Sequence, residues 1–171
     1  MLLSIQQRYI LDVLRELKCL RRRQLQALVQ GKFREIEITD RRMDAMLRQL
    51  RAGCGLRLDG EWISLSEIPL NHRRLEAIDV MLELSECRPQ DFSARCQSPE
   101  LLRFALDGAS LRLFTVATLS DPLRGAWTAR DSPGRMVWIS DSGTAPTGLA
   151  LPPKQFFAAR QPDGSHRFYG S

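Results

Sequence analysis

Long apolar runs are missing from this chain of 171 residues. No stretch approaches the roughly 18–20 consecutive apolar residues that a membrane-spanning helix needs. The opening segment, MLLSIQQRYILDVLREL, is interrupted by charged residues and lacks the basic start and the cleavage site of a signal peptide. We therefore expect a cytoplasmic protein with no membrane partner.

Metal-ligating residues are scarce as well. The chain contains four cysteines and two histidines, and no two cysteines are spaced as CxxC. Structural zinc sites need such ligands at short, regular spacings, so we expect no metal site. The cysteines should be reduced, partly buried thiols, and the histidines should be solvated at the surface. The residues concerned are Cys19, Cys54, Cys87, Cys96, His72 and His166.

Catalytic signatures are absent too, since the sequence has no P-loop, GxGxxG, GxSxG or HExxH motif. The nearest approach is WISDSGTAP at 138–146, where a hydrophobic strand enters Asp-Ser-Gly-Thr as in aspartic proteases, with Asp141 as the acid. Those enzymes need a mainly β chain, which the pattern does not indicate, and Asp-Ser-Gly is a common turn composition. We interpret this segment as a turn and expect no cofactor and no enzymatic activity.

Positive charge is concentrated near the start of the chain. Residues 1–70 hold 13 Lys and Arg against 9 Asp and Glu, whereas residues 71–171 hold 12 against 11. Such an asymmetry favours contacts between the first part and nucleic-acid phosphates. Arginine makes up 22 of the 25 basic residues, and it suits bidentate contacts to phosphate and guanine, although a GC-rich genome gives the same bias.

Helical periodicity dominates the first 55 residues. Ser4 and Gln7 form a capping box ahead of an apolar-periodic segment, which predicts a helix over 5–18. After a break at Cys19-Leu20, RRRQLQALVQG predicts a second helix that ends at Gly31. The following segment, FREIEI, is compatible with a loop or a short strand.

A third helix and a hairpin complete this part of the chain. Thr39 or Asp40 caps the helix, and the glycines at 53 and 55 end it. The segment LRLDGEWISL then predicts a tight hairpin turning at Asp59-Gly60, because Asp-Gly is the strongest two-residue turn signal. Three helices followed by a hairpin predict a winged helix-turn-helix domain over residues 1–68.

The remaining residues, 70–171, predict a second domain. Asn71 caps a helix over HRRLEAIDVMLELS. The runs LLRFAL, SLRLFTVATL and RMVWIS are typical of strands, DPLRGAWTARDS of a short helix, and KQFFAARQPDGSHRFYGS of a closing hairpin. The fold class is therefore α+β, with a helix packed on a small mixed sheet.

The third helix carries the strongest functional pattern. Met43, Met46, Leu47 and Leu50 share one sector of the helix and must face the core, which leaves the opposite sector small in its centre and cationic around it. Arginine side chains on such a face are the usual contacts of a reading helix in the major groove. The nine candidate DNA-contacting residues are Arg21, Arg22, Arg23, Arg41, Arg42, Ala45, Arg48, Gln49 and Arg57.

Within this set, the expected roles differ. Arg41, Arg48 and Gln49 should reach base edges, and Ala45 should permit close approach. The run Arg21–Arg23 and Arg42 should contact phosphates, and Arg57 should reach an adjacent groove from the hairpin. Asp40, Asp44 and Glu61 reduce the positive field around them.

The order of several short segments along the chain resembles a known group of proteins. The segments are IQQRYILDVL, LRQLRAG, AIDVMLEL, SPELLRF and FFAARQPDGSHRFYG. Their layout is similar to an uncharacterised domain-of-unknown-function family of bacterial conjugative elements and, more distantly, to plasmid replication-relaxation proteins. The resemblance implies a winged helix followed by a restriction-endonuclease-like domain.

In the active nucleases of that superfamily, carboxylates on adjacent strands hold Mg²⁺. Relaxation-type proteins often carry Pro-Asp on the first strand and Glu-x-Asp on the next. Here the resemblance aligns these positions with Pro99-Glu100 and with Thr115-Val116-Ala117, which has no carboxylate. It therefore implies a degenerate, inactive nuclease-like domain.

The sequence thus predicts a non-enzymatic protein that binds duplex DNA as an accessory or regulatory component of a mobile genetic element. A relaxase or replication protein is an expected protein partner, and the second domain is an expected dimerisation surface. The alternative is a protein-interaction or scaffold module whose winged helix does not contact DNA. A metal-dependent nuclease is a minor alternative.

Overall fold

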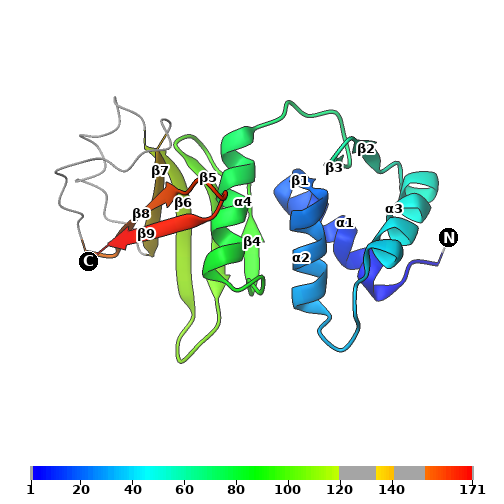
Figure 1. The fold of residues 1–171 in the computed structure, drawn as a ribbon, viewed down its shortest axis with the longest axis horizontal. Helices are drawn as coiled ribbons and strands as arrows, with labels where there is room; N and C mark the ends of the chain where they lie inside the picture. The colour runs from blue at the N-terminus through cyan, green and yellow to red at the C-terminus, as the bar shows by residue number, and fades with distance from the viewer. Residues whose placement is uncertain (1, 120–133, 141–152, 171) are drawn as a thin grey trace.

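The computed structural model describes residues 2–119, 134–140 and 153–170, and Figure 1 shows their arrangement. Within these ranges the chain forms four helices and two β-sheets, so the fold is of the α+β class. No helix in these ranges is long and apolar enough to cross a membrane. The expected helix over DPLRGAWTARDS and the turn at Asp141 lie outside the described residues.

The first part of the chain consists of three helices and a small sheet. Its elements are α1 (Ile5–Leu17), β1 (Cys19–Arg21), α2 (Arg22–Lys32), α3 (Asp40–Cys54), β2 (Arg57–Asp59) and β3 (Trp62–Ser64). The predicted capping box is present, because the Ser4 hydroxyl accepts from the Gln7 amide and the Gln7 side chain accepts from the Ser4 amide. Thr39 caps α3 and Gly55 ends it in the left-handed conformation at φ 69°.

Two local details differ from the sequence prediction. The break at Cys19-Leu20 is strand β1, which pairs with β3 and completes an antiparallel sheet of order β1-β3-β2. The hairpin turns one residue later than predicted, since Asp59 pairs with Trp62 and the turn residues are Gly60 and Glu61. Gly60 has φ 59°, a conformation that L side chains rarely adopt, so the glycine rather than the aspartate fixes the turn.

The second part is a helix on a six-stranded sheet. Its elements are α4 (His72–Leu84), β4 (Asp91–Ser93), β5 (Glu100–Leu106), β6 (Arg112–Leu119), β7 (Arg135–Ser140), β8 (Gln155–Arg160) and β9 (His166–Gly170). The strands lie in sequence order. Pairing is antiparallel from β4 to β6, parallel from β6 to β8 and antiparallel between β8 and β9, which confirms the predicted mixed sheet and closing hairpin.

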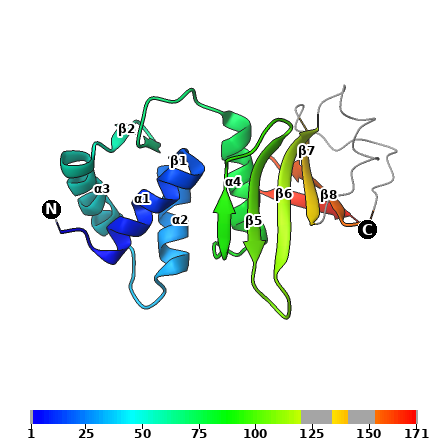
Figure 2. The same ribbon diagram turned by 180° about the vertical axis from the view of Figure 1, so that it is seen from behind.

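The two parts pack against each other through α4. In Figures 1 and 2, α4 and β4, the edge strand of the large sheet, are the elements of the second part that lie nearest α2, and α3 lies at the opposite end of the molecule from that sheet. Buried hydrophobic side chains from both parts form one continuous cluster, which includes Leu14 and Leu28 of the first part and Ile78, Leu102 and Val116 of the second. The junction is therefore a packed interface and not a loose linker.

Gly31 serves this junction in a way that the sequence did not indicate. It lies inside the last turn of α2 and has no positive φ, so it is not the predicted stop. A Cβ atom at this position would lie 1.9 Å from the carbonyl oxygen of Cys87, just beyond α4. Glycine is needed here because the backbones of the two parts approach so closely.

Candidate nucleic-acid interface

Helix α3 presents a cationic face to solvent. Its buried side consists of Met43, Met46, Leu47 and Leu50, as the helical pattern predicted. On the other side Arg41, Arg42 and Arg48 are exposed, and none of them forms an ion pair with any residue that the structure describes. Ala45 lies half-buried between them, so the centre of the face is small.

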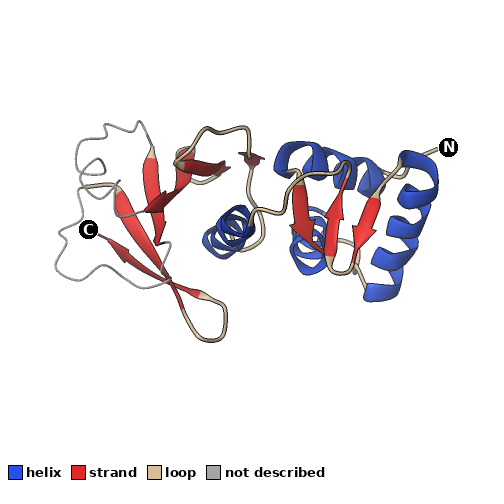
Figure 3. Cartoon of the chain, turned by 90° about the horizontal axis from the view of Figure 1, so that it is seen from above, coloured by secondary structure: helices blue, strands red, loops and turns tan. Residues whose placement is uncertain are grey.

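This face is not covered by the second part of the chain. Figure 3, seen from above, shows α3 at the outer side of the three-stranded sheet, with α4 and the large sheet on the other side. Because α3 lies away from α4 and the large sheet, its exposed residues Arg41, Arg42 and Arg48 are not covered by the second part of the chain.

Arg22, the first residue of α2, faces α3 and is fully engaged there. Its Nε and Nη2 donate to Asp44 Oδ1 (3.2 and 2.9 Å), its Nη1 donates to Asp40 Oδ1 (3.2 Å), and its Nη2 also donates to the Asp40 carbonyl (3.2 Å). Gln26 Oε1 accepts a further bond from Nη1 (3.1 Å). Partial burial lowers the pKa of Arg22, but the hydrogen bonds to Asp44 and Asp40 outweigh it and raise that pKa above its usual value.

The neighbouring arginines point toward α4. Asp79 accepts hydrogen bonds from Arg21 Nη1 (2.8 Å), Arg23 Nη2 (3.0 Å) and Gln24 Nε2 (2.8 Å). The side chains of Arg21 and Asp79 are only 14% and 13% exposed, and the Arg21 guanidinium also lies over the Trp62 ring. This cluster fastens the two parts of the chain together, so Arg21 is held in the junction, whereas Arg23 remains 65% exposed.

The last two candidates each have an internal partner. Gln49 accepts a hydrogen bond at Oε1 from the buried Gln7 (2.6 Å), which ties α3 to α1. Arg57 on the hairpin pairs with Glu67 (2.6 Å), and both side chains are more than half exposed. Arg21, Arg22 and Arg57 are therefore paired within the chain, in contrast to Arg41, Arg42 and Arg48 on the open face of α3.

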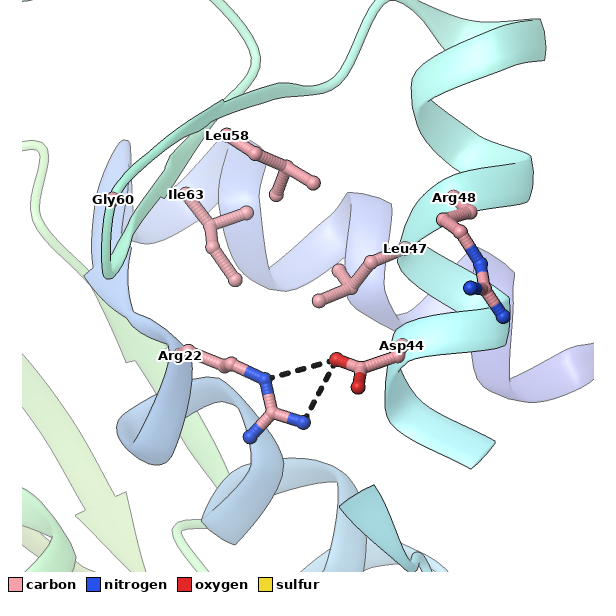
Figure 4. Close-up of a pocket in the computed structure, with 7 residues that line it drawn as sticks. All are labelled: Arg22, Asp44, Leu47, Arg48, Leu58, Gly60 and Ile63. Atoms are coloured by element: carbon pink, nitrogen blue, oxygen red, sulfur yellow. Dashed lines mark hydrogen bonds and ion pairs between the residues drawn. The ribbon is translucent and has the colours of Figure 1, made fainter. Parts of the chain in front are cut away.

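A shallow pocket lies where α2, α3 and the hairpin meet, and Figure 4 shows its lining. Leu47, Leu58 and Ile63 form its apolar wall, and Gly60 marks the hairpin turn. The Arg22 and Asp44 side chains reach toward each other across one side of it. The pairing of Arg22 with two aspartates was missed from sequence, because it joins residues 18 and 22 positions apart and depends on how α2 crosses α3.

The expectation for His166 is wrong, since its side chain is 1% exposed. Its Nδ1 lies 2.9 Å from Glu83 Oε1 and its Nε2 lies 3.4 Å from Glu76 Oε1, so it joins β9 to α4. Burial lowers the pKa of His166, but the hydrogen bonds and charges of the two glutamates outweigh it, and the pKa lies above 6.5. His72 is exposed, as expected, and the four cysteines are free and partly buried.

Glu100, at the first position of the proposed nuclease-like motif, pairs with the guanidinium of Arg103. The register of β5 and β6 places Ala117 directly opposite it. Across the residues that the structure describes, no three His, Cys, Asp or Glu side chains are grouped so as to hold a metal ion.

Comparison with known proteins gives no relative: no family model, no curated protein and no solved structure matches the chain.

Proposed function

We propose that the chain binds duplex DNA through helix α3 and acts without catalysis, as an accessory or regulatory protein. The observation that carries this proposal is the open cationic face of α3, with Arg41, Arg42 and Arg48 exposed and unpaired among the described residues. The order α1-β1-α2-α3-β2-β3 with a β1-β3-β2 sheet supports a winged helix, in which the last helix before the hairpin enters the major groove.

The spacing of the side chains supports separate roles on this face. Arg41, Ala45 and Arg48 are four and three residues apart, so they form one stripe along the helix. In this proposal the two arginines reach base edges and the small Ala45 lets the helix approach the groove. Arg42 flanks the stripe and contacts a phosphate, as Arg57 does from the hairpin once it leaves Glu67.

The proposed roles of the second part are association with a partner and self-association. The similarity of the segment order to proteins of conjugative elements supports a place in a mobile genetic element, with a relaxase or replication protein as partner. The alignment of Glu100 with Ala117 supports an inactive nuclease-like domain, since a single carboxylate does not provide the ligand set of a Mg²⁺ site. Self-association through this part would place two reading helices on one duplex.

The test compares two variants that lose the same charge. Arg41→Ala with Arg48→Ala removes two arginines from the stripe, and Arg112→Ala with Arg160→Ala removes two exposed arginines from the strands of the large sheet. Affinity for a mixed-sequence duplex is measured by fluorescence anisotropy at about 100 mM salt. We expect the affinity of the first variant to fall at least tenfold and that of the second to fall less than threefold.

Equal losses in the two variants would mean that only net charge matters and would overturn the reading-helix proposal. The absence of DNA binding by the unmodified chain would favour the alternative function, a protein-interaction module. The internal pairing of Arg21, Arg22 and Arg57 is the observation that favours that alternative, because paired arginines contribute less to a phosphate-binding surface.

A further inference from the structure

We infer that the carboxylates of Asp40 and Asp44 bind the Arg22 guanidinium where a DNA phosphate would otherwise bind it, and that they thereby lower the affinity of this chain for DNA. The inference rests on the proposed function and deepens it, because it names a residue pair that sets the affinity of the same surface. It concerns the corner where the start of α2 faces α3 and the hairpin (Figure 4).

Every donor of the Arg22 guanidinium is occupied. A guanidinium has five N–H groups, and the Arg22 side chain donates five hydrogen bonds. Four of them end on the Asp40 carboxylate, the Asp40 carbonyl and Asp44 Oδ1. A phosphate can bind this guanidinium only by displacing one of these acceptors, because no donor remains for it, and three of the five bonds end on the two carboxylates.

The displacement is feasible because these contacts lie at the surface. The side chains of Asp44 and Asp40 are 52% and 79% exposed, and that of Arg22 is 32% exposed. Ion pairs in such surroundings contribute little and exchange readily with solvent ions. The contrast is Arg21 with Asp79, where both partners are less than 15% exposed and the pair belongs to the packed junction.

The two aspartates also lie next to the stripe that Arg41, Ala45 and Arg48 form along α3. Asp44 directly precedes Ala45 on α3, and Arg48 lines the same pocket as Arg22 and Asp44. The Asp44 side chain is more exposed than that of Arg22, 52% against 32%, so its negative charge repels a phosphate that approaches this corner. Asp44→Asn removes that charge and leaves only a neutral amide oxygen on Arg22, a weaker acceptor that a phosphate displaces more easily, so one additional phosphate contact becomes available.

The experiment is a double-mutant cycle on the full chain with Asp44→Asn, Arg22→Ala and the two combined. Affinity for the mixed-sequence duplex is measured by anisotropy at several salt concentrations. We expect Asp44→Asn to tighten binding about threefold to tenfold when Arg22 is present and less than twofold in the Arg22→Ala background. Its slope of log K against log salt should be steeper by about 0.9, the value for one more phosphate.

Asp12→Asn is the matched control, since Asp12 is an exposed aspartate paired with an arginine on α1. Asp12→Asn should increase the affinity for the duplex by less than twofold. Thermal melting followed by circular dichroism checks that each variant is folded. An equal gain from Asp44→Asn in both backgrounds would overturn the inference and leave the DNA-binding proposal standing. A chain that binds no duplex at all would overturn both.

Discussion

Replacing Asp79 with alanine should lower the free energy of unfolding by about 3 kcal/mol. Asp79 lies on α4 and its side chain is 13% exposed, and it accepts from Arg21, Arg23 and Gln24 of the first part. Removing one partner of a largely buried ion pair costs about 3–5 kcal/mol, because the remaining charge loses its counter-charge without regaining water. Arg21, 14% exposed, is that remaining charge.

The loss expected for Asp79→Ala lies at the lower end of this range for two structural reasons. Arg21 keeps a second carboxylate nearby, Glu61 at 3.9 Å, and keeps its position over the Trp62 ring. Arg23 is 65% exposed and returns to water when Asp79 is removed, so its pair contributes at most about 1 kcal/mol.

Urea denaturation followed by circular dichroism measures the effect through the midpoint and the slope of the transition. Asp79→Asn, which keeps the shape but loses the charge, should cost about half as much as the alanine variant. Arg23→Ala is the control and should cost less than about 1 kcal/mol. A loss of less than about 1 kcal/mol for Asp79→Ala, or equal losses for Arg23→Ala and Arg21→Ala, would contradict this prediction.

Two further substitutions test other contacts between α4 and its neighbours. Because the pKa of His166 is raised by Glu76 and Glu83, its stabilising contribution is present below pH 6.5 and is lost as the pH rises through the folded-state pKa. The difference in unfolding free energy between the native chain and His166→Gln should shrink with rising pH, and a constant difference across pH 6–9 in urea titrations would contradict this. Gly31→Ala should lower the thermal unfolding midpoint by several degrees, since the added Cβ would collide with the Cys87 carbonyl. A raised midpoint would contradict this, because it would mean that the higher helix propensity of alanine stabilises α2 by more than the collision destabilises the junction.

Local signals in the sequence predicted the helices of the first part well. The capping box at Ser4, the cap at Thr39 and the left-handed Gly55 are each decided by residues within four positions of one another. The apolar sector of α3 was predicted for the same reason, because one face of a helix must be buried whatever it packs against.

Contacts between distant segments could not be predicted in this way. Strand β1 is three residues long and exists only because β3, some forty residues later, pairs with it. Gly31 was interpreted as a helix stop because its true constraint, the backbone of Cys87, is not near it in the sequence. His166 was expected at the surface because nothing close to it reveals that two glutamates of α4 enclose it.

The same distinction between local pattern and long-range contact applies to the residues of the candidate site. The residues that stay open, Arg41, Arg42 and Arg48, follow from the helical pattern alone. The pairing of Arg21 with Asp79 depends on how the start of α2 packs against α4. The pairing of Arg22 with Asp40 and Asp44 depends on how α2 packs against α3. A run of three arginines that looks like one phosphate-binding cluster in the sequence therefore divides into a junction contact and a restrained surface contact.

The salt dependence of binding to a duplex tests the central claim most directly. If Arg42 on α3 and Arg57 on the hairpin neutralise about two phosphates, log K should fall linearly with log salt at a slope of about −1.8, and Arg42→Ala should reduce that slope by about 0.9. A binding constant that does not change between about 50 and 200 mM salt, or a slope that Arg42→Ala leaves unchanged, would contradict the account.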